Sequence, residues 1–97
     1  MDVENVFSSK PRMKIVIVLM QVGQLNVSEI AHKLQINYLT TRKHLRVLED
    51  EGILQHTLYG RVRLFKLNHA SPKTMAVQNL IEAWNHISDN AYKCTEA

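Results

Sequence analysis

The residues best suited to chemistry are cations and hydrogen-bond donors on one predicted helix, residues 38–51. Its side opposite the apolar stripe carries Tyr38, Leu39, Thr40, Arg42, Lys43 and Arg46. An α-helix fits the major groove of B-DNA, and its N-terminal half can reach base edges. Arg42 and Lys43 can donate to guanine, whereas Leu39 can touch a thymine methyl and Arg46 can clamp a phosphate. This helix therefore predicts a DNA-reading element.

A second group of cations lies on a predicted β-hairpin, with strands near 53–59 and 61–67 joined around Gly60. The tip of this hairpin carries Tyr59, Arg61 and Arg63. Taken alone, the basic helix is typical of an ordinary amphipathic helix with a solvated outer face. A basic loop beside it changes the interpretation, because such a loop fits the backbone or the minor groove next to a major-groove helix.

The charge distribution agrees with a polyanionic partner. The chain has 97 residues and a formal net charge of +3, enough length for one small domain. No acidic residue occurs between Ile30 and Leu48 or between Gly52 and Ile81. A segregated basic surface of this kind indicates binding to nucleic acid.

Catalysis and metal binding find little support. The five histidines share no evident helical face with a second ligand, and the chain has neither a Gly-rich phosphate loop nor a nucleophile with a plausible base. We therefore predict no enzyme, no cofactor and no metal site. Cys94 is the single cysteine, which excludes an intrachain disulfide and leaves an intermolecular one open.

The elements that position the helix and the hairpin can be read from caps and apolar spacing. A helix near 10–22 should have Pro11 in its first turn and end at Gly23. We expect its core face to comprise Ile15, Leu19 and Val22.

A short helix near 27–34 should follow the capping box at Asn26 and Glu29, and Asn37 should cap the helix over 38–51. That helix should pack through Thr41, Leu45 and Leu48. The fold class expected is mainly α with a small β-hairpin, a winged helix-turn-helix.

Residues 8–67 resemble the ArsR-like winged helix-turn-helix family of prokaryotic transcriptional regulators. SKPRMKI at 9–15 is similar to the opening helix of that family, and VSEIA at 27–31 to its "V-S-E-L-A". TTRKHLRVLEDEGIL at 40–54 resembles the recognition helix, and GRVRLFKL at 60–67 the wing. The resemblance implies a homodimer, usually a repressor, on a pseudo-palindromic operator.

Two positions depart from the family pattern. Gln35 stands where a turn glycine is common, and a left-handed backbone there would cost roughly 1 kcal/mol. Metal-sensing members carry a cysteine pair on the recognition helix, and this chain has no cysteine there. Metal sensing is therefore not implied.

The two ends of the chain predict a subunit interface. A final helix near 72–87 repeats apolar residues at helical spacing, although the winged core is complete by Leu67. With the N-terminal segment, the predicted interface comprises Val3, Val6, Phe7, Val77, Leu80, Ile81, Trp84 and Ile87. Residues 1–97 thus form one domain, with a core near 8–67, dimerisation elements at 1–7 and 72–90, and a flexible tail at 91–97.

The leading prediction is a homodimeric, sequence-specific regulator of double-stranded DNA. An architectural DNA coat of low specificity and a protein-binding winged-helix module stay open as alternatives. Residues 15–20 form the longest apolar run, too short to cross a bilayer, so we expect a cytoplasmic, nucleoid-associated protein with no membrane partner. The sequence names no effector, no operator and no direction of regulation.

Overall fold

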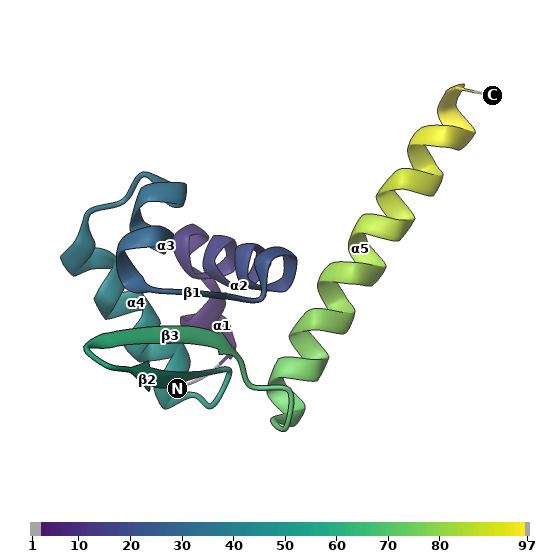
Figure 1. Cartoon of the computed structure of the whole chain (residues 1–97). Helices are drawn as coiled ribbons and strands as arrows, with labels where there is room; N and C mark the ends of the chain where they lie inside the picture. Colours follow the sequence, from purple (N-terminus) through teal and green to yellow (C-terminus); the bar gives the residue numbers. More distant parts are fainter. Residues whose placement is uncertain (1–2, 97) are drawn as a thin grey trace.

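The computed structural model describes residues 3–96, and describes side chains from Glu4 to His86. Five helices and three strands follow one another along this part of the chain (Figure 1). They are α1 (Val3–Phe7), α2 (Lys10–Val22), β1 (Gln24–Leu25), α3 (Val27–Leu34), α4 (Tyr38–Asp50), β2 (Leu54–Tyr59), β3 (Val62–Leu67) and α5 (Pro72–Glu96). This order confirms the predicted winged helix-turn-helix.

A small antiparallel sheet, ordered β1-β3-β2, joins the wing to the helices. β1 pairs with β3 through Leu25 and Phe65, and the hairpin closes with Tyr59 opposite Val62. The hairpin loop has two residues and begins with Gly60 at φ 63°, a value that glycine adopts without steric cost. β1 thus holds the wing beside the start of α3.

Side-chain caps fix where the two helices of the motif begin. The Asn26 Oδ1 accepts from the Glu29 backbone N–H at 2.8 Å, and the Glu29 Oε1 accepts from the Asn26 N–H at 3.0 Å. The Asn37 Oδ1 accepts from the Thr40 N–H at 2.7 Å and so caps α4. The predicted capping box and the predicted Asn37 cap are both confirmed.

The turn between α3 and α4 contains a left-handed residue at the position where a turn glycine is common. Gln35 has φ 55° and ψ 46° and is the one non-glycine residue with positive φ among those described. Its N–H donates toward the carbonyls of Ala31 and His32, which ends α3. A β-carbon in this conformation costs roughly 1 kcal/mol, so the turn is made against a local preference.

The core lies where α2, α3 and α4 meet the sheet. Thr41, Leu45 and Leu48 are buried as predicted, and the Thr41 Oγ1 donates to the Asn37 carbonyl at 2.9 Å. The other buried apolar side chains are Val6, Ile15, Val16, Leu19, Leu25, Val27, Ile30, Ala31, Ile53, Leu54, Phe65, Leu67 and Ile81.

One core prediction is wrong. Val22, predicted to lie on the core face, is 49% exposed, whereas Ile15 and Leu19 are buried as predicted. Val22 is the last residue of α2, and Gly23 ends the helix there with φ 103°. The side chain therefore projects beyond the elements that cover Ile15 and Leu19.

α5 extends away from the winged core as a single long helix (Figure 1), and the molecule measures 52 × 27 × 23 Å. Its first turn is fastened to the core, because the Thr74 Oγ1 donates to the Ile53 carbonyl at 3.0 Å and the Lys73 Nζ donates to the Glu51 Oε2 at 2.9 Å. The helix runs to Glu96, past the predicted end at Ile87 and into the predicted tail. Within the described residues, no helix is both long enough and apolar enough to span a bilayer.

Candidate nucleic-acid interface

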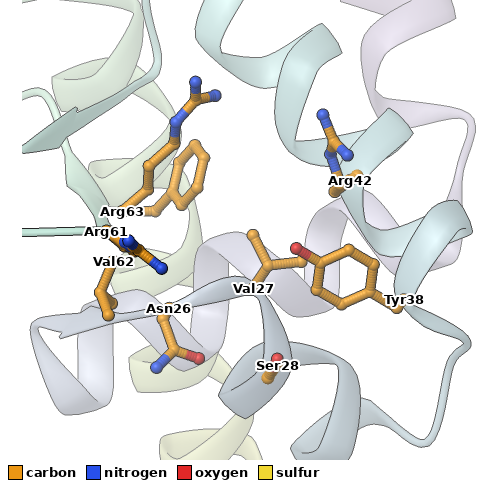
Figure 2. A pocket seen from close by; sticks show the side chains of 9 residues that line it. Asn26, Val27, Ser28, Tyr38, Arg42, Arg61, Val62 and Arg63 are labelled. Atoms are coloured by element: carbon orange, nitrogen blue, oxygen red, sulfur yellow. The ribbon is translucent and has the colours of Figure 1, made fainter. Parts of the chain in front are cut away.

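A groove of about 360 Å³ lies between the start of α4 and the wing. Figure 2 shows Arg61 and Arg63 on one side of the groove, Tyr38 and Arg42 on the other, and the start of α3 at its base. The full lining is Asn26, Val27, Ser28, Tyr38, Arg42, Arg61, Val62, Arg63 and Phe65. The helix and the loop that the sequence proposes as DNA contacts therefore share one concave surface.

The groove is cationic. Its lining includes three arginines and no carboxylate. Arg42, Arg61 and Arg63 are all exposed, and none of them makes an ion pair with an acid in the part of the chain that the structure describes. Exposed guanidinium groups without acidic partners produce a local positive potential, which attracts phosphate.

The remaining predicted contacts lie around the groove rather than in its lining. Leu39 is 66% exposed on the outer side of α4, where Lys43 and Arg46 are exposed as well. Thr40 is half-buried, and its N–H is used by Asn37. Tyr59 is 58% exposed on β2. The groove thus brings together Tyr38, Arg42, Arg61 and Arg63, and leaves the other five outside its lining.

The contribution of α3 to the groove is not evident from the sequence. Asn26 and Ser28 line the groove at the start of that helix, and Val62 lines it from the wing. Backbone N–H groups at a helix N-terminus attract phosphate oxygens. The capping box marked this N-terminus, but its closeness to the wing depends on the pairing of Leu25 with Phe65, which no local pattern reveals.

Polar contacts fasten the sides of α4. The His56 Nδ1 on β2 contacts the Glu49 Oε2, and the imidazole lies 5.4 Å from the Phe65 ring. On the other flank, the His44 Nδ1 accepts from the Arg12 Nε at 3.3 Å. Partial burial and the nearby guanidinium lower the pKa of His44, so the neutral acceptor form is favoured.

Two carboxylates at the end of α4, those of Glu49 and Glu51, have partners on other elements. The hydrogen bond from Lys73 lowers the pKa of Glu51, and the His56 imidazole contacts the Glu49 carboxylate. Arg46 and Asp50, four residues apart on α4, form no ion pair in the part of the chain that the structure describes. Likewise, no group of three or more His, Cys, Asp or Glu side chains is placed to hold a metal ion in this part of the chain.

A second exposed surface is apolar and lies between α2 and α5. A groove of about 290 Å³ is lined by Met13, Ile17, Leu80, Ile81, Trp84 and Asn85. Trp84 is 69% exposed and Leu80 is 60% exposed, whereas Val6 at 3% and Ile81 at 7% pack into the chain's own core.

Burial within the chain divides the residues of the predicted subunit interface into two groups. Val6 and Ile81 have almost no surface left for a partner, because the core of their own chain already covers them. Phe7 and Val77 are partly buried against that core. The side chains of Val3 and Ile87 lie outside the described residues, so Leu80 and Trp84 form the exposed part of the predicted interface.

Comparison with known proteins identifies the family. A model described as "Bacterial regulatory protein, arsR family" matches residues 9–56, which span α2, both helices of the motif and the start of the wing. Over these residues the chain matches the ArsR-like family of winged helix-turn-helix regulators. The match confirms the family that the sequence motifs indicate.

Two curated relatives agree with this assignment. The ArsR-like chain is 32% identical over 78 residues to a CadC homolog of Staphylococcus aureus, a cadmium resistance transcriptional regulatory protein, covering 77% of this chain and 64% of the relative. It is 29% identical over 77 residues to the uncharacterized HTH-type transcriptional regulator B-115 of Sulfolobus spindle-shape virus 1, covering 79% and 67%. The chain thus spans about two thirds of the length of each relative.

Solved structures confirm the fold. An apo double mutant of Lactococcus lactis ZitR superposes with a TM-score of 0.71 at 22% identity, over 93% of this chain and 66% of that one. Mb0332 of Mycobacterium bovis, described as a homodimeric winged helix-turn-helix DNA-binding domain and a possible ArsR-family regulator, gives 0.69 at 20% identity, over 88% and 73%. At these identities the likeness establishes architecture alone.

Proposed function

We propose that this ArsR-like chain acts as a homodimeric repressor that binds a pseudo-palindromic operator in double-stranded DNA. The observation that carries the proposal is the groove in which Arg42 of α4 faces Arg61 and Arg63 of the wing without a carboxylate in the lining. In this arrangement α4 enters the major groove and the wing follows the adjacent backbone or minor groove.

The roles of the side chains follow from their places. Arg42 and Lys43 donate to base edges from the first half of α4, with Tyr38, Leu39 and Thr40 close by. Arg46 lies one turn further along and neutralises a phosphate. Arg61 and Arg63, with Tyr59, position the wing on the backbone, so they contribute affinity more than sequence preference.

Dimerisation follows from the apolar surface on α5. Leu80 and Trp84 are large, exposed and adjacent in the groove beside Met13 and Ile17. A two-fold axis through this surface covers both copies of the patch and places two α4 helices about 34 Å apart, one turn of DNA. The homodimeric description of Mb0332 supports this arrangement.

A regulator of this kind works in the cytoplasm on the nucleoid, and nothing in the described site suggests catalysis. Binding of the dimer over a promoter represses transcription by excluding other proteins from the same DNA.

Selection of bound sequences from random duplex DNA tests the proposal. We expect a palindromic consensus with half-sites one helical turn apart, because a two-fold dimer presents α4 twice. Enrichment of no sequence, together with protection along the whole of a genomic fragment, would support an architectural coat instead. Weak affinity for every duplex, with a monomer in sedimentation, would favour a protein-binding module and overturn the proposal.

A further inference from the structure

Arg12 of α2 connects two elements that are separate in the sequence. Its Nη1 donates to the backbone carbonyls of Asn5 at 2.6 Å and Val6 at 3.2 Å, and its Nε donates to the His44 Nδ1 at 3.3 Å. The two carbonyls belong to the last turn of α1, where helical carbonyls lack partners within the helix. One guanidinium therefore caps α1 and holds a side chain of α4.

The position of His44 beside the buried stripe of α4 explains how the contact with Arg12 can restrain that helix. With 3.6 residues per turn, the buried stripe of Thr41, Leu45 and Leu48 is flanked by His44 on one side and by Glu49 on the other. Glu49 contacts His56 of the wing, and His44 contacts Arg12. Polar contacts on both flanks resist rotation of α4 about its own axis, which the apolar stripe alone permits more freely.

We propose that Arg12 is a positioning residue for DNA recognition, which fixes the rotation of α4 through His44 and makes the orientation of that helix depend on α1. The inference rests on the proposed function. It gives Arg12 and His44 a part in operator specificity although neither lines the basic groove. A small rotation of α4 would move Arg42 and Lys43 away from the base edges that they contact.

The chemistry requires these residue types. Arginine offers several N–H donors in a rigid fork, so one side chain serves the Asn5 and Val6 carbonyls and the imidazole together. A lysine ammonium is a single point of donation on a flexible stem and cannot span these acceptors. The imidazole must present an unprotonated Nδ1, and asparagine can offer its Oδ1 at a similar position.

Four variants test the proposal on a site selected with the wild-type protein. Arg12→Gln, Arg12→Lys and His44→Leu should each lower affinity for that site about tenfold and reduce its preference over random DNA. His44→Asn should stay within about twofold of wild type. The salt dependence of binding should not change in any of the four, because no phosphate contact is removed.

A double variant, Arg12→Gln with His44→Leu, should lose no more than either single change, since both remove one shared contact. Circular dichroism and thermal unfolding identify a variant that fails to fold, and Arg12→Lys keeps the charge and the aliphatic stem if Arg12→Gln does not fold.

Two results would overturn the inference. A folded His44→Leu protein with wild-type preference would show that the contact does not position α4. An equal loss in His44→Asn and His44→Leu, with a flatter salt dependence, would mean that the imidazole contacts DNA itself. Absence of any preference in the wild-type protein would instead overturn the proposed function, so the two failures are distinguishable.

Discussion

The basic groove and the apolar groove are both open to solvent, but exposure to water is favourable for the first and unfavourable for the second. Exposed guanidinium groups such as Arg42 and Arg61 are well hydrated, so the basic surface is stable without a partner. Exposed Trp84 and Leu80 keep apolar area in water at about 25 cal/mol per Å². In the proposed homodimer, the apolar surface is covered constitutively by association, whereas the basic surface binds DNA reversibly and in a salt-dependent manner.

The largest expected effect comes from a charge on the apolar surface. Leu80→Glu should weaken the dimer at least a hundredfold, because association would then bury a carboxylate without a partner, at a cost of about 3 kcal/mol. Sedimentation velocity over a concentration series measures this change.

A matched control is available on the wing. Leu58 is 58% exposed and Leu80 is 60% exposed, so Leu58→Glu introduces the same charge at an equally accessible leucine that does not line the apolar groove. Its sedimentation should equal that of the wild type. Equal weakening by both changes would show that the contrast between the two surfaces is wrong.

On the basic surface, Arg42 should have the larger single effect. Arg42→Ala should cost roughly 1–3 kcal/mol on the selected site and relax base preference at one position of each half-site, since a bidentate contact to a base is lost. Fluorescence anisotropy on the selected duplex and its single-base variants measures both quantities. A uniform loss on every duplex would reassign Arg42 to a phosphate.

Arg61 on the wing should give a smaller and different effect. Arg61→Ala should weaken binding by a similar factor on all sequences and reduce the slope of log affinity against log salt by about 1. Titrations at several salt concentrations check this expectation. A change in base preference without a change in slope would mean that the wing reads sequence.

Features that depend on nearby residues were predicted correctly from the sequence, with one exception. Three predicted features depend on neighbours within a few residues, and the structure confirms them: the cap at Asn26, the cap at Asn37 and the buried stripe through Leu45. The prediction that Val22 is buried was wrong, because helical spacing does not reveal where the elements that cover α2 end.

Contacts between distant segments could not be predicted from local sequence patterns. The approach of Ser28 to the wing depends on strand pairing, and the contact between Arg12 and His44 joins residues 32 positions apart. Likewise, only the packing of α1 and α5 separates buried Val6 and Ile81 from exposed Trp84. These features require the assembled fold, because residue type and spacing at one place do not determine them.

A smaller effect, on the free energy of unfolding, is expected at the turn that joins α3 to α4. Gln35→Gly should raise the free energy of unfolding by about 0.5–1 kcal/mol, because glycine adopts φ 55° without the clash of a β-carbon. Urea unfolding measures the change, and Gln35→Ala, which keeps the β-carbon, should give no gain. A loss with glycine would show that the Gln35 side chain stabilises the turn.

The smallest effect should come from protonation of His44. Its pKa in the folded chain is lowered from the ordinary value of 6.5, so the unfolded chain binds more protons in this range. The contribution of His44 to stability should be fully present above pH 6.5 and decline as pH falls below it. Urea unfolding at pH 7.5 and 5.5 should show a steeper decline for wild type than for His44→Asn, which cannot titrate. Equal declines would exclude this role.

The basic groove and the adjoining exposed face of α4 are proposed to bind DNA, and one measurement tests this proposal most directly. Affinity for the selected duplex is compared at one fixed salt concentration between wild type and the triple variant Arg42→Ala, Lys43→Ala, Arg61→Ala, with the dimer verified by sedimentation in both. We expect the triple variant to lose at least a hundredfold in affinity while it keeps its fold and its dimer. Equal affinity of the two proteins would contradict the account.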